Sequence, residues 1–260
     1  DGGCEGLVPC GTTGEAVTLS DAEYRMVVRA VVEEAQGRVP VVAGAGTAST
    51  AHSIHLAKIA KEVGADGLLL VCPYYNRPTQ AGLEANFRAI VQAVPLPSIL
   101  YNIPVRCGVD MSVETLERLS DVKEIIGIKE ATNNVLRSQS IVARCGERFS
   151  VMSGDDALTV PIMAVGGRGV ISVSANAFPR EVSEVARQMM KGEHAAALAL
   201  HQRLLPVHEV MFVESNPGPL KALLGAAGHM SGDVRLPLVK ASEDTLARVR
   251  SAVKQAGLTL

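Results

Sequence analysis

Seven short apolar runs, separated by stretches of helical periodicity, constrain the fold of this chain more than any other feature. The runs are rich in Val, Ile and Leu and do not alternate with polar residues, which is typical of parallel strands buried on both faces. Strands that alternate with helices form right-handed βα units. The predicted strands are Glu5–Cys10, Pro40–Gly44, Gly67–Cys72, Ser98–Asn102, Glu124–Lys129, Phe149–Gly154 and Gly169–Val173. The sequence therefore predicts an α/β fold.

The segments between and after these runs carry helix signals. Leu19–Gln36 has Ser20 as a candidate N-cap and four valines between residues 27 and 32 on one stripe. Thr50–Val63 is followed by Gly64, a common residue just past a helix end. After the last strand, helices are predicted over Glu181–Lys191, His194–Phe212, Pro219–Ala227 and Glu243–Ala256. The last three are expected to form a C-terminal helical domain.

The number of strands and the start of the chain together favour an incomplete barrel. Seven strands are one fewer than the eight of a (β/α)₈ TIM barrel, although a doubly wound sheet could also have seven. The chain does not begin with Met and opens directly before its first strand. We therefore expect a (β/α)₈ barrel over residues 1–192 that lacks its first βα unit in this chain. The helical domain would span residues 193–260 and pack on the barrel.

Composition excludes several classes of protein. Twenty-five Lys and Arg against 27 Asp and Glu leave a net charge of −2, which argues against nucleic-acid binding. The sequence contains no run of 18 apolar residues, so no membrane span is predicted, and we expect no signal peptide. The five cysteines are odd in number and widely spaced, so we expect reduced thiols and a cytoplasmic location. His52 and His55 lack a third metal ligand nearby and are expected on a solvated helix face.

Lys129 is the first candidate for chemistry, because it ends a predicted buried strand. In parallel α/β folds the active site lies at the carboxyl ends of the strands. Desolvation lowers the pKa of a lysine and frees its amine to attack a carbonyl group. The alternative is a structural lysine that pairs with Glu130 or extends to solvent at the strand end.

Three further polar groups follow predicted strands. Residues 11–15 (GTTGE) offer two hydroxyls and backbone N–H groups to a small anion, or form a plain strand-to-helix turn. Residues 101–106 (YNIPVR) combine a tyrosine that could relay protons with an arginine that could grip a carboxylate. Residues 73–78 (PYYNRP) hold two tyrosines and fit either an interface anchor or a turn.

Together, the motifs GTTGE, PYYNRP, YNIPxR, GIKEAT, SGDD, GVISV and ESNPxPxK occur in one order along the chain. This set resembles the pyruvate-dependent class I aldolases and, within them, the dihydrodipicolinate synthase family. The resemblance implies a lyase with a (β/α)₈ barrel, a C-terminal helical domain and a homotetramer built as a dimer of dimers. It implies condensation of pyruvate with L-aspartate 4-semialdehyde in the synthesis of diaminopimelate and lysine, without a metal or an organic cofactor.

The resemblance also implies roles for individual residues. Lys129 would form the imine with pyruvate. Tyr101 would shuttle protons, linked through the Thr12 hydroxyl to Tyr75, which the family lends across the tight-dimer interface. The substrates would be bound by Thr13 at the pyruvate carboxylate, Arg106 at the semialdehyde carboxylate, Gly154 and Ile171 along the pocket, and Asn216 from the helical domain.

Two departures from the family pattern bear on regulation and binding. His52 stands where lysine-sensitive members have an acidic residue, and Asp21 and Tyr24 stand at positions that are often His. An imidazole is a poor ligand for an ammonium group, so we expect weak or absent inhibition by lysine. Cys107 replaces the usual Thr after Arg106, a change that would alter how the loop holds the arginine.

Two other readings of the residues compete with this one. A sibling aldolase or lyase, of the N-acetylneuraminate lyase or 2-keto-3-deoxy-sugar aldolase type, would share Lys129 and Tyr101. Arg106 and the pair Thr12–Thr13 favour the synthase, because a second small carboxylated substrate needs that arginine. A non-catalytic barrel subunit is the reading from a different class, and retention of the catalytic set argues against it.

Overall fold

The computed structural model describes residues 2–259 and divides the chain into two compact units. The sheet unit comprises Glu5–Gly11 and Leu19–Ile171, and the helical unit comprises Asp1–Cys4, Thr12–Thr18 and Ser172–Leu260. The chain thus crosses between the units several times in its first part. The predicted domain division at residues 192 and 193 stays a prediction.

The sheet unit holds one six-stranded parallel sheet with the strand order β1-β2-β3-β4-β5-β6. Its strands are β1 (Val42–Gly44), β2 (Gly67–Val71), β3 (Ser98–Asn102), β4 (Ile125–Glu130), β5 (Ser150–Ser153) and β6 (Gly169–Val170). The order follows the chain without a reversal, which separates this sheet from the doubly wound type. The α/β fold with parallel strands is confirmed.

The predicted strand Glu5–Cys10 is wrong as a regular strand. It pairs with the edge of the sheet only through a parallel bridge between Leu7 and Val41. Pro9 has no N–H to continue the ladder, and Cys10 turns out of it with a φ of 56°. Backbone bonds to Leu7 O and Pro9 O still tie the segment to β1.

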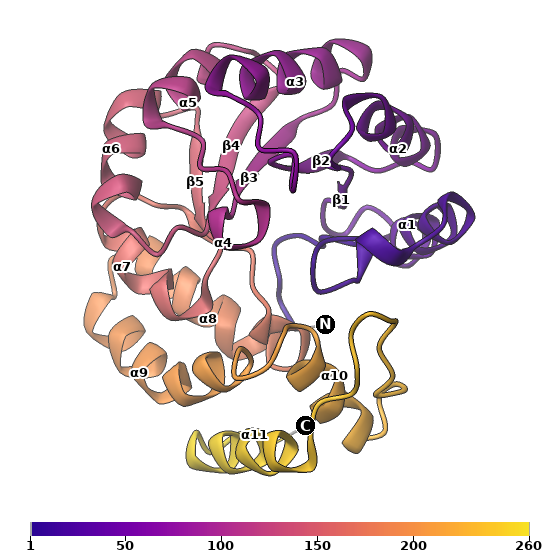
Figure 1. Ribbon diagram of the computed structural model, residues 1–260. Coiled ribbons are helices and arrows are strands. Elements are labelled where there is room, and N and C mark those ends of the chain that lie inside the picture. Colours follow the sequence, from indigo (N-terminus) through magenta and orange to yellow (C-terminus); the bar gives the residue numbers. More distant parts are fainter. Residues whose placement is uncertain (1, 260) are drawn as a thin grey trace. The chain divides into compact units, whose positions relative to one another are not determined.

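The longer helices between the strands lie on the outer side of the sheet (Figure 1). They are α1 (Asp21–Ala35), α2 (Thr50–Glu62), α3 (Gln80–Ala93), α5 (Val113–Ser120), α6 (Val135–Cys145) and α7 (Thr159–Ala164). The short helices α4 (Pro104–Cys107) and η2 (Asp156–Leu158) follow the ends of β3 and β5. Ser20 caps α1 in a capping box with Glu23, as its sequence position predicts. The strands between them are buried, with Leu68, Leu70 and Ile128 at 0% exposure.

The helical unit contains the predicted C-terminal helices. They are α8 (Pro179–Met190), α9 (His194–Val210), α10 (Gly218–Ala226) and α11 (Glu243–Gln255), with the short helices η1 (Ala16–Thr18) and η3 (Ser174–Asn176). Buried apolar side chains such as Leu204, Leu220 and Val249 form its core. Among the described residues, no helix is both long and apolar enough to span a membrane. The five cysteines are free thiols, as predicted.

Candidate active site

Lys129 and Tyr101 face each other at the carboxyl ends of β4 and β3. The two residues are direct partners in the parallel register. The Lys129 Nζ lies 4.5 Å from the centre of the Tyr101 ring, within the distance at which a ring face attracts an ammonium group. Both side chains are buried, and Lys129 is 9% exposed. The structure therefore brings together the two residues that the sequence places at neighbouring strand ends.

Burial controls the charge of Lys129. The pKa of its amine is lowered to about 8, mainly by desolvation. The Asp156 carboxylate opposes this shift, and the positive charge of Arg106 adds to it. Asp156 begins η2, just after β5, and is 1% exposed. An amine with a pKa near 8 supplies a useful fraction of the neutral nucleophile near pH 7.

Gly154 and Ile171 follow the next two strand ends, β5 and β6. A methyl group on Gly154 would lie 2.7 Å from Ala131 Cβ and 3.0 Å from the Glu130 carbonyl oxygen, so only glycine fits here. The Gly154 N–H donates to Glu130 O at 2.7 Å, and the Ile171 N–H donates to Ser153 O at 2.9 Å. These bonds continue the ladder beyond the strands and fix Gly154 beside β4 and Ile171 beside β5.

Arg106 lies on α4, in the loop that follows β3. Its side chain is exposed, and among residues 2–259 its guanidinium makes no hydrogen bond or ion pair. An unpaired guanidinium held on a short helix is free to bind a carboxylate with two hydrogen bonds. The neighbouring Cys107 is buried, and burial raises the pKa of its thiol to about 11, so the group is neutral near pH 7.

Tyr75 differs from the other predicted site residues because its side chain is 92% exposed. Its backbone takes a φ of 75°, and its N–H donates to Cys107 O at 3.3 Å. Within the part of the chain that the structure describes, its hydroxyl makes no hydrogen bond and its ring contacts no other aromatic ring. The Tyr75 side chain is therefore accessible to a second molecule.

Thr12, Thr13 and Asn216 belong to the helical unit. The Asn216 side-chain amide donates to Thr13 Oγ1 at 3.0 Å, and Asn216 is 5% exposed. Because Thr13 accepts this bond, its own hydroxyl proton is available for another acceptor. The Thr12 carbonyl accepts from the Glu15 N–H at 3.0 Å, which closes the GTTGE turn.

An ion pair that the sequence analysis did not single out anchors the same turn. Lys221 Nζ lies 2.6 Å from Glu15 Oε2, and the Arg235 N–H donates to Glu15 Oε1 at 2.7 Å. These contacts hold the pKa of the Glu15 carboxyl below its usual value, against the effect of its own burial. Lys221 closes the ESNPxPxK motif and Asp156 closes SGDD, so both were visible as motif residues but without a role.

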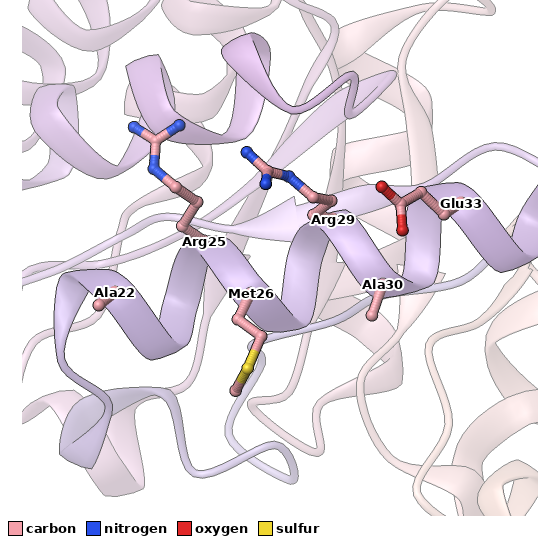
Figure 2. A pocket seen from close by; sticks show the side chains of 6 residues that line it. All are labelled: Ala22, Arg25, Met26, Arg29, Ala30 and Glu33. Atoms are coloured by element: carbon pink, nitrogen blue, oxygen red, sulfur yellow. The ribbon is translucent and has the colours of Figure 1, made fainter.

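A surface hollow of about 300 Å³ lies along one face of α1 (Figure 2). It is lined by Ala22, Arg25, Met26, Arg29, Ala30 and Glu33. Arg25 and Arg29 extend in one direction from the helix, and Met26 extends in the other. None of the predicted site residues lines this hollow, so it is separate from the chemistry at the strand ends.

The two histidines of α2 lie as the sequence predicts, on an exposed helix face. Their rings stack at 6.0 Å, and His55 Nε2 lies 2.7 Å from Asp21 Oδ2. Among residues 2–259 no three His, Cys, Asp or Glu side chains are grouped so that they could hold a metal ion.

Comparison with known proteins places this arrangement in a family. The model of the dihydrodipicolinate synthetase family matches residues 1–256. A 4-hydroxy-tetrahydrodipicolinate synthase from Sorangium cellulosum is 50% identical over 255 residues, which cover 98% of this chain and 85% of that protein. Solved synthases from Methylacidiphilum fumariolicum and Aquifex aeolicus both superpose with a TM-score of 0.97 at 44% identity. They cover 98% and 100% of this chain, and this chain covers 86% and 89% of theirs. A match of this extent, with Lys129 and Tyr101 paired at the strand ends, shows that the chain belongs to the dihydrodipicolinate synthetase family.

Proposed function

We propose that the chain condenses pyruvate with L-aspartate 4-semialdehyde to give 4-hydroxy-tetrahydrodipicolinate, through an imine on Lys129. The observation that carries the proposal is the buried Lys129 amine, with a pKa of about 8, against the Tyr101 ring. Relatives at about half sequence identity bear the name of this activity. The sibling aldolases of sugar acids are less favoured, because these relatives are synthases.

The reaction follows from the properties of an imine. The neutral Lys129 amine attacks the ketone carbon of pyruvate, and loss of water leaves a cationic imine. This cation draws electrons from the adjacent methyl group, which loses a proton to give an enamine. The enamine carbon attacks the aldehyde carbon of the semialdehyde, whose oxygen takes up a proton. The substrate amino group then attacks the imine carbon, closes the ring and releases Lys129. One water leaves overall.

Proton transfer is assigned to the hydroxyls. We assign proton donation and acceptance to Tyr101, whose ring lies 4.5 Å from Lys129 Nζ. We assign Thr12 and Tyr75 to the relay that returns a proton to Tyr101. Tyr75 is 92% exposed within this chain, which supports a role at an interface with a second copy. The assignment includes a homotetramer in which each tight dimer completes its sites by exchanging Tyr75.

Binding of the two substrates is assigned to different groups. Thr13, oriented by Asn216, donates its hydroxyl proton to the pyruvate carboxylate. Arg106 binds the carboxylate of the semialdehyde. Gly154, beside β4, and Ile171, beside β5, are assigned to the lining of the pocket. Since the imine itself serves as the electron sink, the chemistry requires no metal and no organic cofactor.

The finer features of the fold and location belong to the same proposal. The unreversed strand order β1 to β6 supports a (β/α)₈ barrel whose first βα unit is absent from this chain. A biosynthetic enzyme that consumes pyruvate fits the cytoplasm.

Borohydride trapping tests the proposal. The chain is incubated with pyruvate, reduced, and mapped by mass spectrometry, with Lys129→Arg as the control. We expect a stable adduct on Lys129 and product formation when the semialdehyde is added. A folded chain that forms no adduct would refute the imine chemistry. An adduct without product from the semialdehyde, but with cleavage of N-acetylneuraminate, would favour the sibling lyase.

A further inference from the structure

The loop of residues 103–112 connects the end of β3 to the start of α5, and Arg106 lies within it. The Arg106 side chain is exposed, and among the described residues no partner fixes its guanidinium. The position of this cation therefore depends on the backbone of the loop. The contacts that hold the loop decide where Arg106 presents its charge.

One buried side chain ties the two ends of the loop together. Asn102, at the end of β3, is 0% exposed. Its Nδ2 donates to Asp110 Oδ1 at 2.8 Å, and its Oδ1 accepts from the Met111 N–H at 3.1 Å. Asn102 thus satisfies both halves of its amide with residues from the far end of the loop.

A buried ion pair supports Asn102 from the neighbouring strand. Glu130, at the end of β4, lies 3.2 Å from the Arg137 Nε of α6, and both side chains are largely buried. The Arg137 guanidinium also donates to the Met111 carbonyl and lies 3.7 Å from Asp110 Oδ1. A buried carboxylate paired in this way is costly to disturb, because either partner alone would be left as an unpaired charge.

A second set of contacts holds the middle of the loop from the segment after β2. Arg77 Nε donates to the Gly108 carbonyl at 3.0 Å, and Arg77 itself has a φ of 47°, a strained value for a side-chain-bearing residue. Gln80 Nε2 donates to the Asp110 carbonyl at 2.8 Å, and Gln80 Oε1 accepts from the Ser112 N–H at 2.9 Å. The loop is therefore held at its start, middle and end.

We infer that Asn102, Asp110, Glu130, Arg137 and Arg77 form a clamp that determines specificity for the second substrate. The clamp fixes the 103–112 loop so that Arg106 meets the semialdehyde carboxylate without further ordering. Its members are positioning residues, since they act through Arg106. A preorganised arginine loses less entropy on binding and keeps the aldehyde in line with the enamine. The inference rests on the proposed function.

Asp110→Ala and Arg77→Met test the clamp, because both residues are exposed and neither adjoins Lys129 in the chain. Asp121→Ala, an exposed aspartate at the end of α5, is the matched control. We expect KM for the semialdehyde to rise about tenfold in both clamp variants. KM for pyruvate and the rate of borohydride trapping on Lys129 are expected to stay within about twofold of the parent and the control.

A double-mutant cycle with Arg106→Met separates positioning from general damage. If Asp110 acts through Arg106, the double variant Asp110→Ala/Arg106→Met is no worse than Arg106→Met alone. Additive losses, or a semialdehyde KM within about twofold of the parent in both clamp variants, would overturn the inference. Equal increases in both KM values would overturn it as well, since they indicate a loosened site rather than altered recognition. Failure of the proposed function gives a different result: the parent enzyme itself would form neither the Lys129 adduct nor the product.

Discussion

Imine formation on Lys129 is expected to be half-maximal at a pH of about 8, well below the ordinary lysine pKa of 10.5. Burial is the main cause, because the desolvated ammonium form is less stable than the neutral amine. At pH 7 a pKa of 8 leaves about a tenth of the amine neutral, against about 0.03% for an ordinary lysine. The tertiary structure therefore increases the reactive fraction about 300-fold.

A pH-jump experiment measures this directly. The enzyme meets pyruvate for a short time at each pH, and the imine is then trapped with cyanoborohydride at one fixed pH. The trapped fraction should rise with pH and level off above about 8. Asp156→Asn should move the midpoint to lower pH, because the Asp156 carboxylate stabilises the ammonium form. A midpoint close to 10.5, or no response to Asp156→Asn, would refute the argument from burial and charge.

Three further outcomes are expected. Tyr101→Phe should retain the Lys129 adduct but lower kcat about 100-fold, since it removes the proton donor and not the nucleophile; an unchanged kcat would exclude Tyr101 from proton transfer. Lys221→Met should destabilise the chain by about 3 kcal/mol in urea unfolding, because it removes the cationic partner of Glu15, whose side chain is 10% exposed. Lys240→Met, which breaks the exposed pair with Asp233, should leave the stability nearly unchanged, and equal losses in the two variants would contradict this reasoning. Millimolar lysine should leave activity within about twofold, because His52 offers no carboxylate to its ammonium group, and strong inhibition would refute this.

Most strands could be predicted from the sequence, but the irregular edge of the sheet could not. The apolar runs from Pro40 onward form strands. Their Val, Ile and Leu residues do not alternate with polar residues, which suits a strand that is buried on both faces. Glu5–Cys10 also carries Leu and Val without alternation, but it forms a single bridge at Leu7, since Pro9 cannot donate and Cys10 turns at a positive φ. Apolar content alone does not show where a ladder ends.

For the site, the order of residues along the chain specifies which chemical groups are available. A lysine and a tyrosine at strand ends, two adjacent threonines and an arginine are readable in order along the chain, and parallel strands place their ends at one edge. Their roles in the reaction came from the resemblance to a family.

The pKa values and the positions of these groups depend on contacts between segments that are distant in the chain. The pKa of Lys129 depends on burial by other strands and on the charges of Arg106 and Asp156. Thr13 is oriented by Asn216, which lies 203 residues further along the chain. The clamp around Arg106 likewise joins residues from four separate segments, from Arg77 to Arg137. Such contacts are absent from local sequence patterns, because desolvation and hydrogen bonding depend on which segments meet in space and not on their order.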